Sequence, residues 1–347
     1  MPNQFLNITN KYYCFLFTLI TYSFFPQSSL AITINTSPNQ NLNSSGWHIE
    51  YIEHDQLKRE FRYYIPEKIA KDPALVILLH GGTQNMMKLF NKNSGGSKEW
   101  KNLADQNGFI LITPNGTDPK TGSANGKKLN WNDCRHAETT TNRNVNADDI
   151  GFIKKLITWS NTKLKSNSKK VYVTGASNGG MMTYRVATEL TNDVTAVASF
   201  IANLPEDSEC KLPIKPIPML IMNGTNDLFM PWDGGEVKGK GGRVMSTDDT
   251  LKFWLLGNNS DQKHPISKTY ADINRKDKSN VSSICYPAKM NTKRASKQTC
   301  LYKVLGGGHV TPSIKHQTPK WVQRFVIGWQ NRDIEGAKIA WEFFKQF

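Results

Sequence analysis

The chain has 347 residues, of which 38% are hydrophobic and 10% aromatic. This is enough apolar material for one large core, and too little for several ordinary domains with linkers. The formal net charge is +15, but the lysines and arginines are scattered through stretches such as "TKLKSNSKK" and "KGKGGR". A nucleic-acid groove would need a basic stripe with interleaved aromatic residues. We therefore expect a solvated basic surface with no nucleic-acid partner, although some attraction to acidic polymers stays open.

The N-terminal segment differs from the rest of the chain. Lys11 is the only charged residue among the first 31, and an apolar run follows from Cys14 to Phe25 before the small-residue sequence Ser29-Leu30-Ala31. This pattern predicts a signal peptide over residues 1–31, cut near Ala31. A membrane helix is the alternative, but polar residues interrupt an apolar run that is already short for a bilayer.

Export is therefore the expectation, to the extracellular space or the periplasm, with no stable membrane anchor after cleavage. Losing Lys11 with the signal lowers the net charge to +14. Residues 32–45 are rich in Asn, Ser and Thr and predict a loose polar leader. Because no internal repeat or later linker appears, we expect residues 46–347 to form one domain.

The remaining pattern alternates between strands and helices. Two early segments, Trp47–His54 and Arg59–Pro66, have the alternation of a half-exposed hairpin. Later strands are predicted by short continuous apolar runs: "ALVILLHG", "FILITPNG", "KVYVTG", "VTAVASFIA", "IPMLIMNG" and "CLYKVLGGG". Helical patterns are "SKEWKNLADQNG", "DDIGFIKKLITWSNTKL", "MMTYRVATEL" and the C-terminal "IEGAKIAWEFFKQF". This alternation predicts an α/β fold, with a mostly parallel sheet covered by helices on both faces. Functional groups are then expected beyond the carboxyl ends of the strands.

Four cysteines remain after the signal is removed, and an even number in an exported chain suggests two disulfides. Cys285 and Cys300 flank a polar segment of hairpin length, so we pair them and leave Cys134 with Cys210. A metal site at Cys134–His136 is the weaker alternative, because no second ligand pair at zinc spacing accompanies it.

The strongest chemical signal is Gly175-Ala176-Ser177-Asn178-Gly179, which fits G-x-S-x-G between an apolar strand and a helical segment. A nucleophile on such a turn has a strained backbone, and glycine at 175 and 179 avoids collisions with the strand and helix. The alternative is a glycine turn whose serine only caps the helix. The strand–turn–helix context favours Ser177 as a nucleophile.

A serine nucleophile needs a base and a group that orients the base, and in this fold the chain order is Ser, acid, His. Asp227 follows the strand "IPMLIMNG", although it could be an ordinary turn aspartate. His309 ends "CLYKVLGGGHV", while His264 and His316 lie in polar segments that suggest the surface. With an ordinary pKa of about 6.5, a histidine can accept and return a proton near neutral pH.

Ester chemistry also needs donors for the oxyanion, usually one N–H after the nucleophile and one from a loop after an early strand. Asn178 is the first, and Gly82 in "ALVILLHGGTQN" is the second, with Thr83 not excluded. His80 precedes the acid in the chain and is expected to be structural. This chemistry requires no cofactor and no metal.

Several motifs together resemble a known family. "LLHGGTQN", "WNDC", "DDIGFIKKLI", "VYVTGASNGGMMTYRVA", "NGTNDLFMPWDGG" and "GGGHVTP" occur in the order found in the secreted esterases that include polyhydroxybutyrate depolymerases and feruloyl or acetylxylan esterases. The resemblance implies an α/β-hydrolase fold, Ser177 as nucleophile, Asp227 as acid and His309 as base. It further implies the oxyanion loop at Gly82 and an aromatic substrate contact at Trp131, which from the residues alone could equally be a packing residue.

The chain departs from the family at two places. Gly82 stands where members often have cysteine, and Val310 and Thr311 replace a stretch that often contains tryptophan. The leading hypothesis is an exported serine ester hydrolase acting on 3-hydroxybutyrate polymers or oligomers, with feruloyl or acetyl esters of plant polysaccharide as the alternative. A non-catalytic binding protein is a further hypothesis. A nucleotide hydrolase is disfavoured, because Gly241 stands where a phosphate loop needs Ser or Thr.

Overall fold

The computed structural model describes residues 44–91, 94–136, 146–209 and 215–347. The predicted signal peptide lies outside these residues, as does nearly all of the polar leader. Within the described ranges, no helix is long and apolar enough to cross a membrane.

A ten-stranded sheet runs through the molecule in the order β1-β2-β4-β3-β5-β6-β7-β12-β11-β10. Its strands are β1 (Gly46–His54), β2 (Leu57–Ile65), β3 (Leu75–Leu79), β4 (Ile110–Pro114), β5 (Val171–Ala176), β6 (Ala196–Phe200), β7 (Met219–Gly224), β10 (Ile266–Thr269), β11 (Asn280–Tyr286) and β12 (Thr299–Leu305). The six strands from β4 to β12 in this order are parallel, and antiparallel pairs close both edges. The predicted N-terminal hairpin is β1–β2, paired over its whole length.

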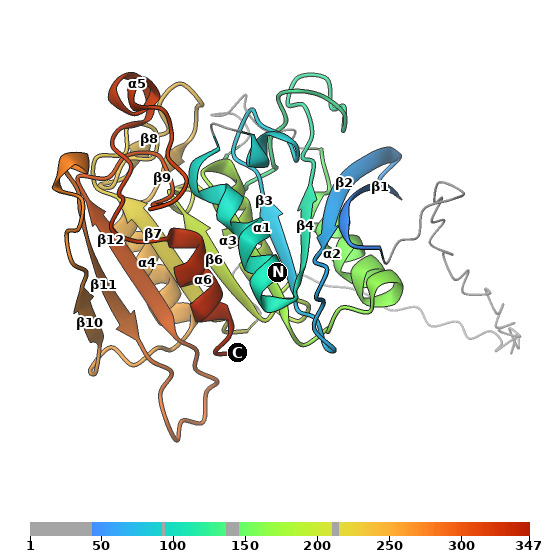
Figure 1. Cartoon of the computed structure of the whole chain (residues 1–347). Helices are drawn as coiled ribbons and strands as arrows, with labels where there is room; N and C mark the ends of the chain where they lie inside the picture. The colour runs from blue at the N-terminus through green and yellow to red at the C-terminus, as the bar shows by residue number, and fades with distance from the viewer. Residues whose placement is uncertain (1–43, 92–93, 137–145, 210–214) are drawn as a thin grey trace, which may run out of the picture. The chain divides into compact units, whose positions relative to one another are not determined.

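Helices cover both faces of the sheet (Figure 1). They are α1 (Glu99–Asn107), α2 (Asp149–Trp159), α3 (Asn178–Glu189), α4 (Thr247–Gly257), α5 (Lys320–Val322) and α6 (Gly336–Phe344). Helices α1 and α6 pack on one face through Trp100, Trp341 and Phe344, and α2, α3 and α4 pack on the other. The central strands are buried on both faces, which explains why they read as continuous apolar runs.

This arrangement is the α/β-hydrolase fold, in agreement with the sequence-based prediction. The elements that were not predicted include β10, β11 and α4. Strand β10 is exposed along its length and β11 alternates weakly, so neither has the apolar run of a central strand. Helix α4 begins with the polar sequence Thr247-Asp248-Asp249, where the Ser246 hydroxyl accepts the N–H of Asp249 as an N-cap.

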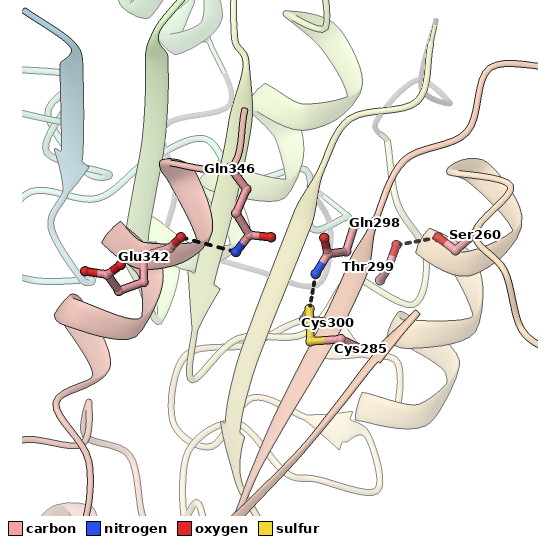
Figure 2. Close-up of a disulfide and its surroundings, with 7 residues drawn as sticks. All are labelled: Ser260, Cys285, Gln298, Thr299, Cys300, Glu342 and Gln346. Atoms are coloured by element: carbon pink, nitrogen blue, oxygen red, sulfur yellow. Dashed lines mark hydrogen bonds between the residues drawn. A yellow bond between two sulfur atoms is a disulfide. The ribbon is translucent and has the colours of Figure 1, made fainter. Parts of the chain in front are cut away.

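The disulfide between Cys285 and Cys300 joins neighbouring strands β11 and β12, where the two residues are direct cross-strand partners. Figure 2 shows it beside Gln298, whose side-chain amide donates to the Cys300 sulfur at 3.2 Å. The predicted pairing of these two cysteines is therefore confirmed. Cys134 is also disulfide-bonded, which excludes it as a metal ligand. Its predicted partner Cys210 lies outside the described residues.

Candidate active site

Ser177 occupies the sharp turn between β5 and α3. Its φ of 58° and ψ of −124° are strained for a residue with a side chain. The glycines on either side make this turn possible. A Cβ at position 175 would stand 2.5 Å from the carbonyl oxygen of Gly179, and one at position 179 would stand 2.5 Å from the carbonyl oxygens of Leu79 and His80. The strand and helix therefore pack closely enough to display the Ser177 hydroxyl beyond the sheet.

His309 bridges Ser177 and Asp227. Its Nε2 lies 2.9 Å from Ser177 Oγ, and its Nδ1 lies 2.7 Å from Asp227 Oδ2. The other carboxylate oxygen of Asp227 accepts the backbone N–H groups of Phe229 and Met230, both at 2.8 Å. Because backbone donors fix the carboxylate, it holds Nδ1 as the proton donor and leaves Nε2 free to accept a proton from the serine. The structure thus brings together three residues that lie far apart in the sequence.

The loop that carries His309 is tied to the segment that follows it. Gly308 N–H donates to Trp329 O at 2.7 Å, and His309 N–H donates to Ile327 O. A Cβ at Gly224 would collide with Gly307 O, and a Cβ at Gly308 would collide with Ile327 O. Glycine at 224 therefore lets β7 pack against the histidine loop, and glycine at 308 lets that loop pack against the segment that follows it.

Two candidate backbone donors, the amides of Gly82 and Asn178, belong to residues that line the same cavity as Ser177. The N–H of Asn178 belongs to the first turn of α3, where helix amides have no partner within the helix. Gly82 lies against it, since a Cβ at Gly82 would stand 3.5 Å from Asn178 Cβ. Thr83 is a poorer candidate donor, because its N–H is already held by Asn130 Oδ1 at 2.6 Å. The choice between Gly82 and Thr83, open from the sequence, therefore favours Gly82.

A cavity of about 390 Å³ opens beside Ser177, His309 and Gly82. Much of its wall is apolar, from Leu89, Met181, Ile201, Phe229, Val237, Val310, Val322 and Ile327. Three residues of the wall, Thr83, Ser177 and Ile201, have positive φ. Such strain is stored where surrounding packing holds it, commonly at functional sites.

Trp131 does not fit its expected role as a substrate contact. Its side chain is 0% exposed, lies outside the cavity wall, and donates its indole N–H to His80 O at 2.9 Å. The indole ring packs against the imidazole of the buried His80, with the two ring centroids 4.9 Å apart. This corrects the role implied by the resemblance and agrees with the packing alternative.

The "WNDC" loop instead forms hydrogen bonds with the side chain of Asn178. Asn178 Oδ1 accepts the N–H of Trp131 at 2.7 Å, and its Nδ2 donates to Asp133 Oδ2 at 2.6 Å. Asp133 is fully buried and also pairs with Arg135. Sequence reasoning missed the side chains of Asn130, Asp133 and Asn178 as supports of the site. The signal available was the polar "NWNDC" stretch itself, but its bonds run to residues elsewhere in the chain: Asn130 accepts Thr83 N–H, and Asp133 accepts from Asn178.

His80 is structural, as expected. It is completely buried; its Nδ1 donates to Gly81 O and its Nε2 accepts the N–H of Gly116. Burial lowers the pKa of His80 to about 4, because the charged imidazolium would be desolvated. A neutral His80 thus links the Gly81–Gly82 loop after β3 to the loop after β4.

The other two late histidines lie away from Ser177. His264 is exposed and pairs with Asp261. His316, expected at the surface, is partly buried and contacts the buried carboxylate of Glu99 at 3.0 Å. In the described part of the chain, no group of three His, Cys, Asp or Glu side chains could hold a metal ion.

Comparison with known proteins finds esterases. The model of the Dienelactone hydrolase family matches residues 101–238. The bifunctional acetylxylan esterase/xylanase XynS20E of Neocallimastix patriciarum is 25% identical over 49% of this chain and 21% of its own length. Acetylxylan esterase A of Aspergillus ficuum is 31% identical over 35% of this chain and 34% of its own length. The chain thus spans about a third or less of these curated relatives.

Among solved structures, the acetyl xylan esterase from Aspergillus awamori superposes with a TM-score of 0.52. Its sequence is 16% identical, and the match covers 81% of this chain and 98% of that one. At this identity the likeness supports the fold alone. Family model, relatives and fold together confirm the resemblance inferred from the sequence, which is to the esterases of the α/β-hydrolase fold.

Proposed function

We propose that the protein is a serine carboxylic-ester hydrolase in which Ser177 is the nucleophile, His309 the general base and Asp227 the residue that orients it. The observation that carries the proposal is the chain of two hydrogen bonds from Ser177 through His309 to Asp227. A serine, a histidine and a carboxylate in this sequence of contacts are the parts that acyl transfer requires.

The reaction follows from the geometry. His309 Nε2 takes the Ser177 proton as Oγ attacks the ester carbonyl, and the negative charge that develops on the carbonyl oxygen is stabilised by the N–H groups of Gly82 and Asn178. The tetrahedral intermediate collapses by breaking the bond to the alcohol oxygen, which leaves with the proton from His309. A water molecule, deprotonated by His309, then attacks the acyl-serine and releases the acid and free Ser177.

For the substrate, we favour acetyl or feruloyl esters of plant polysaccharide over polyhydroxybutyrate. The relatives with the matches described above carry acetylxylan esterase in their names, which supports the second of the two substrate classes considered from the sequence. The cavity of about 390 Å³ is also suited to a small acyl group.

We also propose that the protein is exported. The support is the signal-like N-terminal sequence together with the Cys285–Cys300 disulfide, since structural disulfides persist mainly in oxidising compartments. Cell fractionation followed by N-terminal sequencing tests this, and a protein found only in the cytoplasm, with Lys11 retained, would contradict it.

The experiment that tests the function compares turnover of acetylated xylan, methyl ferulate, 3-hydroxybutyrate oligomers and amorphous polyester, with Ser177→Ala as the blank. We expect the polysaccharide esters to be turned over fastest. A preference for hydroxybutyrate esters would contradict the substrate class while leaving the chemistry in place. Turnover no faster than the blank on every substrate would contradict the enzymatic function and favour a binding protein on this scaffold.

A further inference from the structure

A short segment at the mouth of the catalytic cavity exposes its aromatic side chains. This rim segment, residues 319–328, contains α5 and the π-helical turn Gln323–Ile327 that continues it, and Figure 1 shows α5 projecting at the upper left of the molecule. Val322 and Ile327 line the cavity. Trp321 and Phe325 are instead 64% and 71% exposed. One segment thus presents one set of side chains to the catalytic cavity and another to solvent.

The rim segment is fixed by buried amides. Gln330 is 0% exposed; its Oε1 accepts Thr318 N–H at 2.8 Å and its Nε2 donates to Thr311 O at 3.0 Å. Gln323 accepts the N–H of Gln330 at 3.0 Å and donates to Thr318 O at 2.6 Å. The backbone that carries the exposed rings is therefore held in place before any ligand binds, so binding costs little conformational entropy of this segment.

Trp321 and Phe325 are four residues apart, about one helical turn, and so lie on the same side of the segment. Large exposed aromatic side chains in such proximity are uncommon on a monomer surface unless something binds them. Their immediate chain neighbours Lys320 and Arg324 are exposed as well, and the Arg324 guanidinium lies 5.3 Å from the Phe325 ring centroid. The exposed surface of the rim segment is thus both aromatic and cationic.

The stretch of chain that contains the rim segment carries only positive charges. From Val310 to Arg332 the chain contains no acidic residue, while it contains Lys315, Lys320, Arg324 and Arg332. Lys315 is paired with the buried Glu99, but Lys320 and Arg324 have no ion pair within the described residues. Positive charge at the entrance to a site attracts a negatively charged ligand and speeds its association.

We propose that the rim segment is a docking platform for the polymer that carries the ester: a polysaccharide chain with carboxylate substituents. The proposal rests on the proposed function, since the chain is held there while its ester enters the cavity. The cavity of about 390 Å³ is far smaller than a polymer, so most of the chain must continue outside it, beside the segment that lines the cavity with Val322 and Ile327 and exposes Trp321 and Phe325. The rings contact the C–H faces of sugars, and Lys320 and Arg324 pair with the carboxylates. A neutral polyester fits this surface less well, because it offers the cations no partner.

The test measures binding apart from turnover. The full chain with Ser177→Ala is mixed with insoluble acetylated glucuronoxylan, and the bound fraction gives Kd. We expect Trp321→Ala with Phe325→Ala in this background to weaken binding about tenfold. Ile266→Ala is the matched control, because Ile266 is 64% exposed on the distant edge strand β10, and it should leave Kd unchanged. Lys320→Gln with Arg324→Gln should weaken binding to the acidic polymer and not to acetylated xylan stripped of uronic acids.

Measurements of turnover separate a failure of the docking platform from a failure of the proposed esterase function. In the Ser177-containing protein, the aromatic double variant should lower the ratio of kcat/KM on the polymer to that on 4-nitrophenyl acetate by about tenfold. If the aromatic double variant keeps both the wild-type Kd and the wild-type ratio of kcat/KM values, the rim segment is not a docking platform. The proposal would also be overturned if the double variant lost affinity for amorphous polyester but kept its affinity for the polysaccharide. Absent turnover by the wild type with normal polymer binding would instead remove the proposed function.

Discussion

His309 Nε2 lies 2.9 Å from Ser177 Oγ although 132 residues separate them in the chain. The contact exists because β5 and β12 run in the same direction in one sheet, so that the turn after β5 and the glycine loop after β12 meet at the same edge. Asp227, which follows β7 between them, orients the imidazole from the same edge. Parallel strand direction therefore assembles the site.

The role of Asp227 is tested by Asp227→Asn. The substitution preserves the size of the side chain and can keep the bonds to Phe229 and Met230 N–H, but an amide NH₂ would face His309 Nδ1. The imidazole would then favour the tautomer that carries its proton on Nε2, which cannot accept a proton from serine. We expect kcat to fall by about 10⁴ with little change in the midpoint of thermal unfolding. A loss of kcat below tenfold would show that another group orients His309.

The support of the oxyanion amide is tested by Asn178→Ala. The backbone N–H stays, but the side-chain bonds to Trp131 and Asp133 are lost, and Asp133 remains buried with one donor fewer. We expect a loss of about 1–3 kcal/mol in the free energy of unfolding, and about a tenfold fall in kcat, which is less than removal of a donor costs.

Asn258→Ala is the matched control. Asn258 is also buried and bonds Ile217 N–H and Thr299 Oγ1. These residues lie near the N-terminal ends of β7 and β12, whereas Ser177, Asp227 and His309 follow the C-terminal ends of their strands. It should lose similar stability and keep its kcat. Equal losses of kcat in the two variants would mean that Asn178 acts only through global stability.

The buried His80 predicts a loss of stability in acid. Its folded-state pKa is about 4, below the ordinary 6.5 of the unfolded chain. Between these values the unfolded chain binds a proton that the folded protein does not, so the free energy of unfolding falls as pH drops from 6.5 towards 4. The contribution is about 3 kcal/mol. Urea unfolding at pH 7 and pH 4.5 measures it.

In His80→Gln the difference between the two pH values should shrink, since glutamine does not titrate, even though the variant is less stable at pH 7. His264→Gln changes an exposed histidine and serves as the control. An equally large acid effect in His80→Gln and the wild type would contradict this account of His80.

The Cys285–Cys300 disulfide should contribute stability without contributing to the chemistry. It closes a loop with a sequence separation of 15, for which loop closure in the unfolded chain predicts about 3 kcal/mol. Cys285→Ala with Cys300→Ala should therefore lower the unfolding midpoint measured by calorimetry, while kcat on a small ester at 25 °C stays near that of the wild type. Unchanged melting would show that the cross-strand pairing alone holds β11 to β12.

The sequence was informative where one physical requirement dominates. Central strands buried on both faces need continuous apolar runs, and the turn at Ser177 needs glycine at 175 and 179. Both features can therefore be predicted from the local sequence. The edge strand β10 and the N-capped helix α4 were missed because neither has a distinct apolar period. The burial of Trp131 was also not predictable, since a polar loop around a tryptophan does not reveal which of its neighbours bond to one another. Long-range pairs such as Asn178 and Asp133 depend on folding.

The central claim is that Ser177 carries the acyl group during turnover. Its most direct test is to mix the protein with 4-nitrophenyl acetate, quench in acid within the first turnover, and measure the mass of each peptide. We predict a gain of one acetyl group on the peptide that contains Ser177, absent in Ser177→Ala. Ester turnover with an acetyl group on another residue, or with none on any residue, would contradict it.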